Sequence, residues 1–191
     1  MKIFLFFAMA CVILILGSPA SQAYVYTFNP GPADLQDLNE YNAYTWGIDW
    51  QSDEEIREVV LTFRGIADYR VEDNDFLYIH LLDDAQIGTL RIFDRDATAD
   101  FFSGQGILID AWSDPLGGGP GIDLTYTFSD LGLIDLFSTY AADGRFGFAF
   151  DSDCHYFNDK VELTVTTAVP EPATLILLGL GLVGLGALRR K

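Results

Sequence analysis

Short stretches in which apolar and polar residues alternate fill the centre of the chain, and glycine, proline, asparagine and aspartate separate them. Alternation at every second residue gives a strand one apolar face and one polar face. Turn residues that recur roughly every 8–15 positions keep such strands short. The pattern predicts eight or nine strands, at residues 24–28, 44–50, 58–66, 76–82, 88–93, 106–112, 122–128, 145–150 and 160–166.

These strands predict a mainly β fold, an antiparallel, jelly-roll-like β-sandwich, because two packed sheets each need one apolar face. A closed barrel is the alternative. A parallel α/β fold is not expected, since the only helical stretch is residues 130–142, where apolar side chains recur at three- and four-residue spacing between Leu131 and Phe137. Ser129 is the expected N-cap of this short helix, and residues 143–144 are its expected end.

Residues 1–23 have the features of a secretory signal peptide. Lys2 supplies a minimal positive start, residues 3–17 form an apolar core, and Ser-Gln-Ala at 21–23 is a small-x-small cleavage site. Cleavage after Ala23 would make Tyr24 the first residue of the exported protein.

The C-terminal stretch has three parts in a fixed order: Pro170-Glu171-Pro172, an apolar run at residues 173–188, and Arg189-Arg190-Lys191. The apolar run holds no charge and, as a helix at 1.5 Å per residue, would be roughly 24 Å long, slightly less than a bilayer core of about 30 Å. Three basic residues behind it match the positive-inside rule. We therefore expect a transmembrane helix at residues 173–188 that stops at the basic end.

This order resembles the C-terminal sorting signal of PEP-CTERM proteins. The resemblance rests on Val169 to Leu175, followed by the Gly/Leu run and Arg189-Arg190, and covers about a tenth of the chain. It implies that residues 169–191 are handled by an exosortase, a transpeptidase-like membrane enzyme of Gram-negative envelopes. It also implies delivery to the cell surface or to the extracellular polymer matrix. An ordinary C-terminal anchor is the alternative.

Between these segments, residues 24–168 are expected to form one extracytoplasmic domain, which is long enough to bury a core. Four of the 11 basic residues and one of the 28 acidic residues lie in the terminal segments, so the domain has 7 basic and 27 acidic residues and a net charge of −20. Such a surface repels phosphates, and no nucleic-acid partner is expected. It suits a soluble exported domain, or one that collects divalent cations.

Cys154 and His155, with Asp151 or Asp153, are the residues most suggestive of catalysis. Adjacent side chains on a strand point to opposite faces, so Cys154 and His155 do not easily form a nucleophile–base pair. His80 adds no zinc-binding spacing. We therefore expect no catalytic residues and no enzyme. As the one cysteine of the domain, Cys154 cannot form an internal disulfide and is expected to be buried.

The densest polar cluster contains Asp151, Asp153, Asn158 and Asp159, in a predicted loop between two strands. Calcium takes several carboxylate and carbonyl oxygens, so these four residues are candidate calcium ligands. The cluster lacks the glycine and the terminal glutamate of an EF-hand loop. The alternative is a turn in which Asp and Asn side chains bond their own backbone. Further acidic groups lie at residues 72–75, 83–84 and 94–100.

Trp46, Ile48 and Trp50 share one face of a predicted strand, which favours a place in the core over a sugar-stacking platform. Tyr41 and Tyr44 are the better candidates for ligand contact.

The function predicted from these features is that of an exported, non-enzymatic cell-surface or exopolysaccharide (biofilm) matrix protein, held transiently in the inner membrane through residues 173–188. One alternative is a calcium-assisted, lectin-like carbohydrate-binding sandwich. A secreted polysaccharide hydrolase that uses an acidic pair is another. The expected partners are an exosortase, the inner membrane and exopolysaccharide. No cofactor is required, and calcium is the one candidate.

Overall fold

The structure is a computed structural model that describes residues 23–70, 75–96, 98–114 and 117–168, together with Gly179 and Gly181. The folded unit considered below is Val25–Thr167. The predicted signal peptide up to Gln22 lies outside the described residues. So do the Pro-Glu-Pro motif, the basic end, and the predicted transmembrane helix apart from its two helical glycines. No helix within the described ranges is long and apolar enough to cross a membrane.

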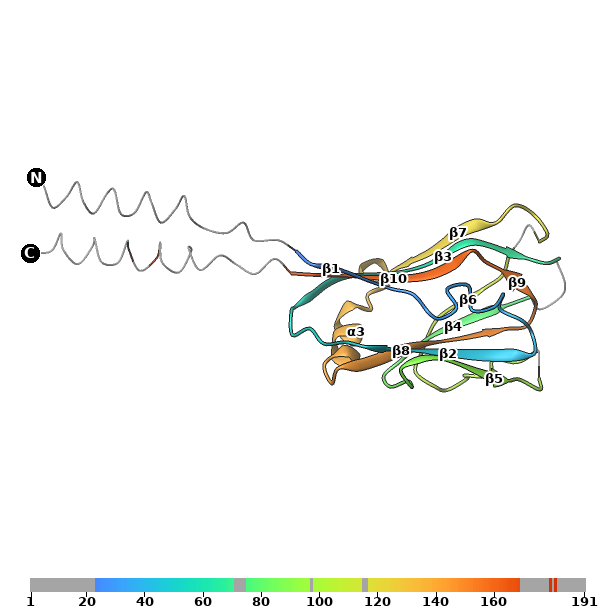
Figure 1. Cartoon of the computed structure of the whole chain (residues 1–191), viewed down its shortest axis with the longest axis horizontal. Coiled ribbons are helices and arrows are strands. Elements are labelled where there is room, and N and C mark those ends of the chain that lie inside the picture. Colours follow the sequence, from blue (N-terminus) through green and yellow to red (C-terminus); the bar gives the residue numbers. More distant parts are fainter. Residues whose placement is uncertain are drawn as a thin grey trace, which may run out of the picture. The chain divides into compact units, whose positions relative to one another are not determined.

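Two five-stranded antiparallel sheets form the unit (Figure 1), which confirms the prediction of a mainly β, antiparallel fold. The first sheet has the order β1-β10-β3-β7, with the short β9 paired to β3, and the second has the order β5-β2-β8-β4-β6. The bounds are β1 Val25–Phe28, β2 Asn42–Asp49, β3 Ile56–Asp68, β4 Leu77–Leu82, β5 Gly88–Phe93, β6 Ile107–Trp112, β7 Ile122–Thr127, β8 Arg145–Ser152, β9 Tyr156–Phe157 and β10 Lys160–Thr167.

Strands that follow one another in sequence mostly lie in different sheets. β1, β3, β7 and β10 belong to the first sheet, and β2, β4, β6 and β8 belong to the second, where β5 adds an edge beside β2. This topology carries the chain back and forth between the two sheets. It also places the first and last strands side by side, with Val25 opposite Thr166, so the chain enters and leaves the unit at one end.

One core joins the inner faces of both sheets. Phe63 of β3 and Phe150 of β8 are fully buried and meet edge to face, with ring centroids 5.4 Å apart. The alternation therefore predicts the inward faces correctly, and Trp46 and Trp50 also lie in the core, as expected. Tyr44 is 2% exposed, so its prediction as a ligand contact is wrong. The apolar residues of β3, β8 and β10 in this core are Ile56, Val59, Leu61, Phe63, Ile66, Phe146, Phe148, Phe150, Val161, Leu163 and Val165.

The single predicted helix at residues 130–142 is replaced by two: α2, Phe128–Leu131, and α3, Ile134–Ala141. Gly132 has φ 68°, a left-handed conformation that ends α2, and its N–H bonds carbonyls of that helix. The first helix starts earlier than expected because Phe128 is buried and contacts Phe137 edge to face at 5.5 Å. The N-cap is therefore Thr127, not Ser129.

Candidate functional sites

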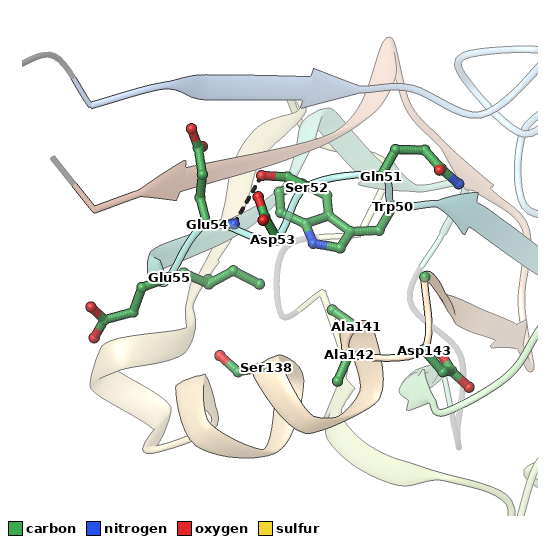
Figure 2. A pocket seen from close by; sticks show the side chains of 12 residues that line it. Trp50, Gln51, Ser52, Asp53, Glu54, Glu55, Ser138, Ala141, Ala142 and Asp143 are labelled. Atoms are coloured by element: carbon green, nitrogen blue, oxygen red, sulfur yellow. Dashed lines mark hydrogen bonds between the residues drawn. The ribbon is translucent and has the colours of Figure 1, made fainter. Parts of the chain in front are cut away.

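A cleft of about 570 Å³ lies between the loop that follows β2 and the end of α3 (Figure 2). Figure 2 shows the Trp50 ring between this loop and the helix end, with Ala141 and Ala142 on the helix side. Most other lining side chains carry oxygen atoms that can accept hydrogen bonds. They include Ser52, Asp53, Glu54, Glu55, Ser138 and Asp143.

Trp50 and Glu54 fix the inner wall of the cleft. Trp50 is 4% exposed, and its ring meets Tyr26 edge to face at 5.0 Å. The Glu54 carboxylate accepts hydrogen bonds from the Tyr26 hydroxyl, at 3.2 Å, and from the Thr167 hydroxyl, at 2.7 Å. The loop is thereby tied to β1 and β10. Because the Trp50 ring is buried against Tyr26, little of its face is open to a ligand. The cleft therefore offers a ligand mainly polar side chains.

The predicted calcium ligands Asp151 and Asp153 lie at the end of β8. Asp151 is 1% exposed; its Oδ2 accepts a 2.7 Å hydrogen bond from the Phe101 N–H, and its Oδ1 has no hydrogen-bond partner among the described residues. The hydrogen bond from Phe101 connects β8 to the end of the acidic loop at residues 94–100, which the sequence alone presents as a separate acidic group.

Burial and mutual repulsion act on this cluster of acids. Burial is the main cause that raises the pKa of Asp151 to about 7, followed by the Asp94, Asp153 and Asp100 carboxylates; the Phe101 N–H opposes it. Burial also raises the pKa of Asp153 to about 6. The Tyr78 hydroxyl lowers it, and the Asp94, Asp100 and Asp96 carboxylates raise it further.

Asn158 and Asp159, the other two predicted calcium ligands, have different partners. Asn158 Nδ2 donates a 2.8 Å hydrogen bond to the Asp34 carbonyl, and the Asp159 N–H donates to the Arg64 carbonyl at 2.9 Å. The contacts of these residues thus connect them to the loop before β2 and to β3. A calcium ion held by all four predicted ligands stays a prediction.

The raised pKa of Asp151 predicts that the metal-free chain loses stability as pH rises. Protonated Asp151 stabilises the folded state fully below about pH 4, and this contribution is lost as pH rises through the folded pKa of about 7. The Asp151→Asn side chain keeps an oxygen that can accept the hydrogen bond from the Phe101 N–H, but it cannot ionise. It should raise stability at pH 8 by about 1–2 kcal/mol, less than the full linkage value because water screens the neighbouring carboxylates.

Thermal unfolding in EDTA from pH 5 to pH 8 measures this effect. The melting temperature of the unchanged chain should fall across the range, and Asp151→Asn should flatten the fall. Asp159→Asn, at an exposed acid, is the matched control. Equal slopes for Asp151→Asn and the unchanged chain would show that Asp151 does not hold the extra proton.

A second buried polar group, which no pattern in the sequence predicts, contains Asp68, Asp75 and Cys154. Their ligand atoms all lie within 4.8 Å of one another, and all three residues are buried, as predicted for Cys154. The Cys154 thiol donates a 2.8 Å hydrogen bond to Asp68 Oδ1 across 86 positions of sequence. Burial is the main cause that raises the pKa of the Cys154 thiol, and the Asp68 carboxylate raises it further.

Cys154 and His155 contact different groups. The His155 ring lies 4.7 Å from the Phe157 ring, and its Nδ1 is 3.4 Å from Asn39 Nδ2. The Cys154 thiol turns instead to Asp68. His80 is buried elsewhere and bonds Asp100 through Nε2 at 3.1 Å.

Residues 168–191 match the family described as the PEP-CTERM protein-sorting motif. No curated protein and no solved structure matches the chain. The match confirms the resemblance seen in the sequence and supports an exported protein that an exosortase sorts, with membrane association during sorting. The chain therefore carries a PEP-CTERM protein-sorting motif at residues 168–191.

Proposed function

We propose that the chain is a non-enzymatic cell-surface or exopolysaccharide-matrix protein, displayed after an exosortase has processed its tail. The observation that carries this proposal is the sorting motif at residues 168–191. It directly follows the folded unit Val25–Thr167, so sorting would deliver one self-contained sandwich. The net charge of −20 over residues 24–168 keeps such a domain soluble and draws cations to its surface.

Fractionation of a Gram-negative host that contains an exosortase tests this proposal. The full chain should be found with the exopolysaccharide and be cut by protease added to intact cells. The processed protein should sediment with the purified polymer without releasing reducing ends. A protein confined to the periplasm would contradict display, and release of reducing ends would show a hydrolase.

Carbohydrate binding, assisted by calcium, is the second candidate, and the cleft in Figure 2 favours it. Sugar hydroxyl groups both donate and accept hydrogen bonds, and the carboxylates and serines of the cleft match them. Acids around such a cleft also supply the oxygen atoms that calcium prefers. The buried Trp50 would support the floor of the site instead of stacking on a sugar.

A substitution that fills the cleft tests this second candidate. Ala142 lines the cleft and is exposed, so Ala142→Trp should reduce sedimentation with the polymer about tenfold or more, a loss of about 1.4 kcal/mol or more in binding. Ala99→Trp makes the same change at an exposed site that does not line the cleft. Equal binding by both variants would place the polymer contact elsewhere.

A further inference from the structure

We propose that Asp68, Asp75 and Cys154 form a binding site for a zinc-type divalent metal ion. The three residues come from separate parts of the sandwich: the end of β3, the segment before β4, and the segment after β8. A bound ion would join these three segments. The site is distinct from the predicted calcium ligands and from the cleft beside Trp50.

The spacing of the ligand atoms suits one ion. Zinc binds thiolate sulfur at about 2.3 Å and carboxylate oxygen at about 2.0–2.2 Å, so the ligands of a tetrahedral site lie about 3.5 Å apart. The ligand atoms of Asp68, Asp75 and Cys154 lie within 4.8 Å of one another, and the Cys154 sulfur is 2.8 Å from Asp68 Oδ1. The three ligand atoms are therefore close enough together to share one ion.

Two buried polar atoms at this site have no partner within the described part of the chain. Asp68 is 1% exposed, and its Oδ2 finds no hydrogen-bond donor, since the side chain beside it, Asp75, is another carboxylate. The Tyr156 hydroxyl is also unpartnered, on a residue that is fully buried. Burial of an unsatisfied polar group is costly, and native structures seldom leave one without a ligand or water. A cation would pair with Asp68 Oδ2, and the Tyr156 hydroxyl would bond a water on that ion.

Several carboxylates lie close together at this site. The Asp68 N–H donates to Asp114 Oδ2 at 3.2 Å, which brings a third carboxylate to the group. The charges of Asp68, Asp75 and Asp114 also act on the Tyr156 hydroxyl, which lies near the same group. A divalent cation would neutralise charges that otherwise repel one another in a poorly solvated site.

The thiol selects the kind of ion. Thiolate is a soft ligand that zinc accepts, whereas calcium requires six to eight oxygen ligands. Without metal, the Cys154 S–H donates to Asp68. Metal binding would release that proton to solvent, and the thiolate would bind the ion together with Asp68 Oδ2. Cys154 also lines a cavity of about 310 Å³, with Glu40 and Asp153 as acidic neighbours and Arg70 as a basic one, which gives the ion a route inward.

Metal titration of the full chain, purified in detergent and stripped with chelator, tests the site. ZnCl₂ should bind tightly at one ion per chain and raise the melting temperature more than CaCl₂ does. CoCl₂ should produce a thiolate-to-cobalt charge-transfer band in the near ultraviolet. Cys154→Ser and Asp68→Asn should weaken zinc binding by about 100-fold or more, since even outer-shell partners contribute about 10–100-fold.

Asp151→Asn, in the other acidic cluster, is the matched control and should keep both the zinc affinity and the cobalt band. Zinc binding that survives in Cys154→Ser would overturn the proposal, as would the absence of one-to-one binding. Far-UV circular dichroism of the metal-free variants checks their folding. If Cys154→Ser does not fold, the cobalt spectrum of the unchanged chain decides, and no charge-transfer band would overturn the proposal.

Discussion

Glu171→Gln is expected to stop release of the protein from the membrane while leaving its export intact. Glu171 is the only acid in residues 168–191, the range that matches the PEP-CTERM protein-sorting motif. Glutamine has the same shape but no charge, so a recognition contact to the carboxylate would be lost. Because a hydrogen bond to a charged group contributes about 1.5–3 kcal/mol, and 1.4 kcal/mol is a factor of ten, release should fall about tenfold or more.

The measurement compares membrane-bound and released protein in a host that contains an exosortase. The unchanged chain should be released, and Glu171→Gln should remain in the membrane fraction at its unprocessed size. Glu55→Gln makes the same change in the folded unit, at an exposed side chain, and should be released normally. Release of Glu171→Gln at the level of the unchanged chain would mean that sorting does not depend on this carboxylate.

Phe148→Ala is expected to destabilise the folded unit by about 3–5 kcal/mol, a large part of the about 5–15 kcal/mol that a typical domain has. Phe148 is fully buried on β8, the central strand of the second sheet, so its removal leaves a cavity that the two sheets cannot close. The substitution also removes the ring contacts of Phe148, which have centroid distances of 5.9–6.3 Å. Its partners are Trp46, Phe128, Phe146 and Phe150.

Chemical denaturation of the full chain in detergent, with the unchanged chain in parallel, measures this loss. The melting temperature of Phe148→Ala should be about 10 °C lower than that of the unchanged chain, as expected for this loss of stability in a unit of this size. Phe93→Ala removes the same side chain from the edge strand β5, where it is 66% exposed, and should cost less than about 0.5 kcal/mol. Similar losses for the two variants would contradict the placement of Phe148 in the core.

Local patterns in the sequence predict the strands well, because a strand's period of two is read from adjacent residues. Phe146, Phe148 and Phe150 show this on β8, and Val59, Leu61 and Phe63 show it on β3, since all six side chains are buried. The two-residue strand β9 gives too short a pattern to recognise. Gly132, with φ 68°, divides the predicted helix, and the first piece begins at Phe128, whose contact with Phe137 the helical spacing does not reveal.

The sorting motif could be identified from sequence alone, because a linear signal is defined by residue order and needs no tertiary contact. The buried group of Asp68, Asp75 and Cys154, in contrast, could not be identified from the sequence. Asp68 and Cys154 form a hydrogen bond across 86 positions of sequence. The pairing of β3 with β9, just after Cys154, places Asp68 opposite Tyr156. Only the register and order of the strands bring these side chains together, and neither is encoded in the spacing along the chain. Sequence therefore determined the strands, their inward faces and the sorting tail, and tertiary structure decided which distant polar groups share a site.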